Sequence, residues 1–177
     1  WDLGVSDAWL SRWEGLFAAL CGDLLPRWRF EMDPFNVAII ERGLGHDAVR
    51  VRRAEFVCTE MYKTLGPILN RYNILICPTL AVPALAADYK SDDPDFRING
   101  KLAHPYIGGE LTYPFNLMSQ CPVASVPSGH AESGIPTGLQ IIGRTFDDVS
   151  VFRAAAAFEA AQPWHGKRPE VISVDNY

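Results

Sequence analysis

Cysteine and histidine side chains most often carry covalent or metal chemistry, and both are sparse in this 177-residue sequence. The cysteines stand far apart and form no C-x-x-C pair, so their spacing supports neither a zinc site nor a disulfide framework. The histidines occur in or near expected loops, and none has metal-ligand spacing to another histidine or an acid. We therefore expect no metal and no cofactor. The residues are Cys21, Cys58, Cys77, Cys121, His46, His104, His130 and His165.

Serine chemistry needs a nucleophile that a neighbouring base activates. The sequence has no G-x-S-x-G segment, which would place a serine on a sharp strand-to-helix turn, and no Ser-Ser pair. Its single Gly-Gly pair, Gly108-Gly109, has no serine beside it. Cys77 closes an apolar run, a position more typical of a core thiol than of a nucleophile. We expect no catalytic residue in this chain.

Residues 1–70 have the pattern of helices. A first helix carries apolar residues on one face, can be capped by Ser6 or Asp7, and should end at Gly22 and Pro26. Asp33-Pro34 marks the start of a second helix. A third helix runs from about Asp47 until Gly66-Pro67 closes or kinks it. The apolar face of the first helix comprises Trp9, Trp13, Leu16, Phe17 and Leu20.

Residues 71–177 alternate short apolar runs with turn-forming residues. Ile74–Cys77, Val123–Val126 and Leu139–Ile142 read as strands that are buried on both faces. Residues 79–100 read as a long loop, and a last helix is expected over Val149–Ala161. This mixture predicts an α/β fold with a mixed β-sheet covered by helices. Three strands are few for that class, so residues 1–177 should be part of one larger domain.

Composition narrows the class of protein further. The formal net charge is −5 and the sequence pI about 5.3, which argues against a nucleic-acid surface. No apolar run approaches the ~18 residues of a membrane span, and residues 1–4 lack the basic start of a signal peptide. The dispersed cysteines favour a cytoplasmic protein. Since there is no initiator Met, we expect the chain to start inside a longer polypeptide or to have been cut.

Three motifs in the second half resemble the C-terminal region of the amidase-signature family. They are Asn73–Thr79, the paired segments Thr112–Leu117 and Pro122–Gly129, and Gly134–Asp148, which is close to G-L-P-x-G-L-Q-I-I-G-x-x-F-D-D. Their order and gaps are similar to those of the family. The helical residues 1–70 fit the family only in pattern. Gly138 within the third motif implies a close backbone approach, and Gln140 a buried amide that must find partners.

The resemblance implies amide hydrolysis by a Ser-Ser-Lys constellation whose residues are absent from this sequence. An N-terminal segment or a companion chain of the same enzyme should supply them, and a homodimer is possible. By resemblance, the strand end at Thr79 and the segment from Gly109 to Asn116 border the substrate pocket. The expected substrate-binding residues are Thr79, Tyr113, Phe115 and Asn116.

The expected function is therefore part of an amidase that converts a small carboxamide or aryl amide to an acid and ammonia or an amine. The runner-up within the family is the A subunit of an aminoacyl-tRNA amidotransferase. It ranks lower because Gly109 stands where members that bind amino-acid-like substrates often have aspartate, with Glu110 next to it. From a different class, the chain could be a non-catalytic binding domain derived from the family.

Overall fold

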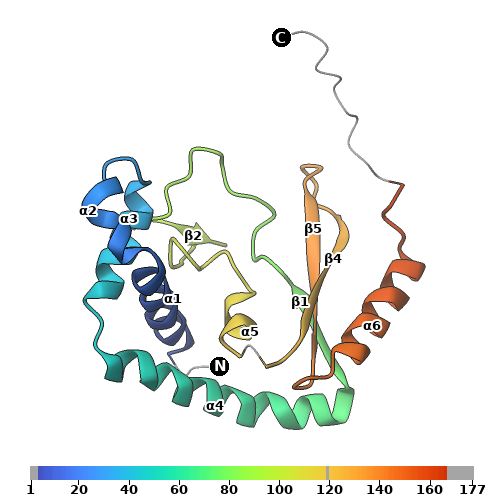
Figure 1. Ribbon diagram of the computed structural model, residues 1–177. Helices are drawn as coiled ribbons and strands as arrows, with labels where there is room; N and C mark the ends of the chain where they lie inside the picture. Colours follow the sequence, from blue (N-terminus) through green and yellow to red (C-terminus); the bar gives the residue numbers. More distant parts are fainter. Residues whose placement is uncertain (1–3, 119, 167–177) are drawn as a thin grey trace.

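The computed structural model describes residues 4–118 and 120–166. The first three helices gather on one side, a small sheet with the last helix α6 outside it stands on the other, and the long helix α4 runs beneath both (Figure 1). In chain order the elements are α1 (Val5–Cys21), the 3₁₀ turn η1 (Gly22–Leu24), α2 (Leu25–Trp28), α3 (Pro34–Leu44), α4 (Ala48–Tyr72), β1 (Ile74–Pro78), β2 (Arg97–Ile98), β3 (Lys101–Leu102), α5 (Tyr113–Leu117), β4 (Val123–His130), β5 (Pro136–Gly143) and α6 (Asp148–Ala161).

The expected helices over residues 1–70 are confirmed, and so are two of their caps. The Asp33 carboxylate accepts hydrogen bonds from the amides of Phe35 and Asn36, and Asp47 accepts one from the amide of Arg50. The first helix begins differently from the prediction: it starts at Val5 after Gly4, with no side-chain cap.

The first helix ends at Cys21, directly before Gly22, as expected. Two further helical segments, η1 and α2, follow over Gly22–Trp28 and were not expected; Pro26 lies in the first turn of α2, where its missing N–H has no helical partner to lose. The expectation that Gly66-Pro67 closes the long helix is wrong. Helix α4 passes through Pro67 and ends at Tyr72. Leu65 and Leu69 on either side of this proline are buried, so packing against the core outweighs the lost backbone bond.

The three expected strands form one sheet in the order β1-β5-β4, and both pairs are antiparallel. Strands β4 and β5 form a hairpin, with a register shift between Pro127 and Gly129. The expected loop over 79–100 contains one strand of a second, two-stranded pair: β2 and β3 meet around Asn99-Gly100, where both residues have positive φ.

Helices cover the two faces of the sheet unequally. Helix α6 packs on one face, where Val126, Ile141 and Val151 form a small core. On the other face, Ile142 joins the main core with residues of α1, α4 and α5 (Figure 1). The expectation that all three strands are buried on both faces is wrong, because Ile76 is 56% exposed. It belongs to β1, which has a strand neighbour on one side within the described residues.

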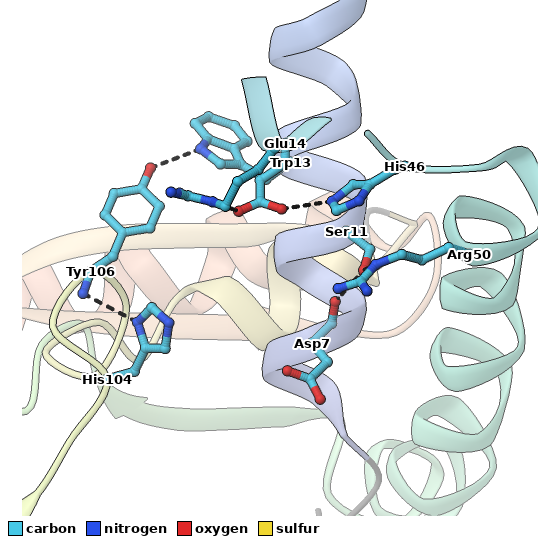
Figure 2. Close-up of polar contacts among 9 residues, drawn as sticks. Asp7, Ser11, Trp13, Glu14, His46, Arg50, His104 and Tyr106 are labelled. Atoms are coloured by element: carbon cyan, nitrogen blue, oxygen red, sulfur yellow. Dashed lines mark hydrogen bonds and ion pairs between the residues drawn. The ribbon is translucent and has the colours of Figure 1, made fainter. Parts of the chain in front are cut away.

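Helix α1 crosses α3 around a buried acid. Glu14 is 5% exposed, and its carboxylate accepts a hydrogen bond from His46 Nε2 at 2.6 Å (Figure 2). It accepts a second one from Arg42 Nε, also at 2.6 Å. Gly43 lies between these partners, directly against the Glu14 backbone. The ion pair and the close backbone contact therefore fix the same crossing.

Candidate functional site

The two segments predicted to border a pocket lie side by side at the end of β1. Thr79 follows the strand, and its carbonyl accepts a hydrogen bond from the Leu111 amide at 2.9 Å. Two residues later the Ala81 amide donates to the Gly109 carbonyl at 2.9 Å. Residues 79–81 and 109–111 thus pair like short antiparallel strands, which fixes the start of the 109–116 segment relative to the sheet.

The side chain of Gln140 connects the end of β1 to the 109–111 segment. It is fully buried in the middle of β5, and its Nε2 donates to the carbonyls of Pro78 at 3.0 Å and Leu111 at 2.8 Å. The expectation that this amide finds buried partners is confirmed for its nitrogen, whereas the buried Oε1 has no hydrogen-bond partner among the described residues. The bonds reach both segments, so a single side chain sets their separation.

A cavity of about 320 Å³ opens where β1 and β4 end and β5 begins, beside this junction. Three of its lining residues carry hydroxyls: Thr79, Ser128 and Thr137. Ser128 Oγ and Thr137 Oγ1 are 3.0 Å apart and bond to each other. The cavity therefore offers neutral hydrogen-bonding groups at strand ends, a usual place for ligands in α/β sheets.

The expected close approach at Gly138 is confirmed, and it involves Thr79. A Cβ on Gly138 would lie 2.5 Å from Thr79 Oγ1 and 3.2 Å from its Cγ2. Glycine at this position thus makes room for the threonine side chain at the rim of the cavity.

Gly138→Ala should lower the stability of the assembled enzyme by about 1–3 kcal/mol, the usual cost of overpacking. It should also reduce kcat/KM, because the Thr79 side chain must move. The double variant Gly138→Ala/Thr79→Ala removes both clashing atoms, so its thermal midpoint should lie above that of the Gly138→Ala single variant. Equal midpoints for the single and double variants would mean that Thr79 does not require this glycine.

The other three predicted residues occupy α5 and have different environments. The Tyr113 hydroxyl lies 3.1 Å from Ser6 Oγ, and its ring packs edge-on against Trp9. Phe115 is 6% exposed and belongs to the main core. Asn116 is exposed and lines a second cavity, away from the one beside Thr79. The four residues therefore do not converge on one cavity, and their contact with a substrate stays a prediction.

This second cavity has a volume of about 670 Å³ and lies between α1 and the segment that leads into α5. Sequence reasoning assigned Trp9 and Trp13 to a core-facing helix stripe and did not select Tyr106. In the sequence, the feature that could have indicated this cavity is the number of aromatic residues in these two segments, together with the acid Glu110. The lining residues are Trp9, Arg12, Trp13, Gly15, Leu16, Val51, Tyr106, Glu110, Asn116 and Leu117.

Burial controls the protonation of the candidate groups. It raises the pKa of the Cys58, Cys77 and Cys121 thiols, so these cysteines stay protonated at neutral pH, as core thiols do. Burial also raises the pKa of Glu110 and, as the largest cause, lowers that of His104. Within residues 4–118 and 120–166, no group of three or more His, Cys, Asp or Glu side chains could hold a metal ion. In the same residues, no helix is long and apolar enough to cross a membrane.

The antiparallel sheet, its covering helices and the cavities at its strand ends define part of an α/β domain. Comparison with known proteins gives the family. The amidase family profile matches residues 26–152, and the chain belongs to that family. An acylamidase of Rhodococcus erythropolis is 32% identical over 96% of this chain. The A subunit of the glutamyl-tRNA(Gln) amidotransferase of Halalkalibacterium halodurans is 39% identical over 71% of it.

Solved structures agree with this assignment. A bacterial aryl acylamidase of the amidase-signature family superimposes on 93% of this chain with a TM-score of 0.77 and 28% identity. The chain spans 36% of that structure, 35% of the acylamidase and 24% of the amidotransferase protein. Both the resemblance and the α/β fold class are confirmed, and the chain corresponds to about a third of an amidase-signature fold.

Proposed function

We propose that this chain is the C-terminal portion of an amidase that hydrolyses a carboxylic amide to an acid and ammonia or an amine. One observation carries the proposal: Thr79 and the 109–111 segment are locked together at the open end of the sheet. Thr79 also borders a cavity that offers hydroxyls and no activated nucleophile. Such a wall can recognise a substrate while residues outside this chain perform the chemistry.

Those outside residues are a Ser-Ser-Lys constellation on an N-terminal segment or companion chain. A serine activated through a second serine and a neutral lysine attacks the amide carbon, and backbone N–H groups stabilise the oxyanion. The lack of any Ser-Ser pair in the sequence supports this division of labour. The net charge of −5 and the free cysteines support a small-molecule amide as substrate and a cytoplasmic location.

A second candidate function is the A subunit of an aminoacyl-tRNA amidotransferase. Its support is the 39% identity to such a subunit, which extends over 71% of the chain. The acylamidase match extends over 96% and so includes nearly all of the helical half. Because of this longer match, and because glycine stands at position 109, amide hydrolysis ranks first.

Release of p-nitroaniline from p-nitroacetanilide tests the proposal. The 177-residue chain alone should give background rates, since it lacks a nucleophile, its base and the oxyanion donors. Combined with its N-terminal segment, it should give turnover well above background. Turnover by the isolated, protease-free chain would contradict the division of labour. An assembled protein inactive on both aryl and aliphatic amides would favour a binding domain.

A further inference from the structure

The cavity between α1 and the segment leading to α5 has a wall of fixed aromatic rings. Trp9 and Trp13 stack with their centroids 5.1 Å apart, and the Tyr106 ring lies 6.1 Å from Trp9. Trp13 Nε1 donates a 2.7 Å hydrogen bond to the Tyr106 hydroxyl, and His104 Nδ1 accepts one from the Tyr106 amide at 3.2 Å (Figure 2). These contacts hold the three rings in place before any ligand arrives.

Glu110 lines the same cavity, and this residue is half-buried. Among the residues that the structure describes, no hydrogen-bond donor or cation pairs with this carboxylate. Arg12 also lines the cavity, but its guanidinium donates to the Leu117 carbonyl at 3.1 Å. Burial alone raises the pKa of Glu110, with no neighbouring positive charge to oppose the shift.

An unpaired carboxylate at an aromatic wall selects the charge of its ligand. A neutral ligand would leave the carboxylate desolvated without a partner, and an anionic ligand would be repelled. A cation gains twice, because the carboxylate accepts a charge-assisted hydrogen bond and the ring faces attract positive charge. Asn116 at the border of the cavity can add a neutral hydrogen bond.

We propose that this cavity binds a primary organic ammonium with an aromatic or apolar body. The ammonium group pairs with Glu110, and the body packs against Trp9, Trp13 and Tyr106.

Titration calorimetry of the assembled enzyme tests the site without any turnover. The probes are phenethylamine, protonated at pH 7.5, and 2-phenylethanol, a neutral molecule of similar shape. Phenethylamine should bind at least about tenfold more tightly, as expected for one charge-assisted hydrogen bond. Glu110→Gln should abolish that preference with little effect on 2-phenylethanol. Glu110→Asp keeps the charge and should retain part of the preference. Glu132→Gln, at an exposed acid in the β4–β5 connection, is the matched control and should change neither affinity.

Each outcome separates this site from the proposed function. Equal binding of the two probes, or a preference that survives Glu110→Gln, overturns the ammonium site. Absence of binding by an enzyme that hydrolyses p-nitroacetanilide overturns the site and leaves the amidase intact. Selective, Glu110-dependent binding by a protein that hydrolyses no amide supports the site and contradicts the amidase.

Discussion

Gly43→Ala should disrupt the crossing of α1 and α3 and lower the stability of the assembled enzyme by about 3 kcal/mol or more. An added Cβ would lie 2.0 Å from the Glu14 carbonyl oxygen and 2.9 Å from the Ala18 Cβ. The closest atom belongs to the backbone, so no side-chain rotation relieves the overlap. The helices must separate, and separation also pulls Arg42 and His46 away from the buried Glu14 carboxylate.

The matched control is Gly15→Ala, which makes the same glycine-to-alanine change inside α1. Its new Cβ would meet Val51 Cγ2 at 3.4 Å, an ordinary contact. Alanine is the better helix former by roughly 1 kcal/mol, so this control should be neutral or stabilising. Thermal unfolding of both variants measures the difference. If Gly43→Ala melts no lower than Gly15→Ala, the helices do not cross as closely as the structure shows.

The local signals in the sequence were sufficient to predict most of the elements. Asp33 and Asp47 begin helices because a short carboxylate can satisfy free amides at a helix start. Ile74–Cys77 forms a strand because it is a short apolar run closed by proline. Local signals did not predict the short helix α2, which has Pro26 in its first turn, and they failed at Pro67, where α4 continues past the proline. Position within a helix and burial of neighbouring residues decide such cases, and neither is visible in a proline alone.

The candidate site was predictable in part. Thr79 and the 109–111 segment do meet, as the resemblance implies. The environment of Phe115 was not predictable. Within the short helix α5 it points into the core, and the sequence around it does not specify the direction of that helix. The aromatic cavity depends on contacts over long sequence distances, such as Trp13 with Tyr106, 93 positions apart. Only a folded chain brings these residues together.

Exposed apolar side chains are consistent with the proposal that further parts of the fold pack on this chain. Ile76 on β1 and Phe152 on α6 are both more than half exposed. Strand β1 also has an open edge within the described residues, where a further strand could pair. Stability measurements on the variants therefore belong in the assembled enzyme, where these surfaces would be covered.

Gln140→Leu should have the second large effect, because it removes both hydrogen bonds that join Pro78 and Leu111. Losing two bonds from a fully buried amide, and leaving their carbonyl acceptors without a partner, should cost about 1–3 kcal/mol of stability, because removal of the unpaired buried Oε1 offsets part of the loss. Leucine has a similar volume, so a packing defect contributes little. The 109–111 segment should then shift relative to Thr79. We expect kcat/KM to fall by about tenfold or more in a folded, assembled variant, because small displacements of positioning groups are costly.

Gln162→Leu is the matched control, since the exposed Gln162 amide donates a single bond to the Ser128 carbonyl at 3.2 Å. That variant should change both stability and activity little, because water can replace a bond at the surface. Thermal midpoints and p-nitroacetanilide kinetics should be measured for the two variants side by side. They show whether the Gln140 amide positions the two segments or contributes only to packing. A Gln140→Leu enzyme with lower stability and unchanged kcat/KM would show that the amide supports the sheet without positioning the pocket. If the two leucine variants behave alike in both measurements, the buried amide holds neither segment in place.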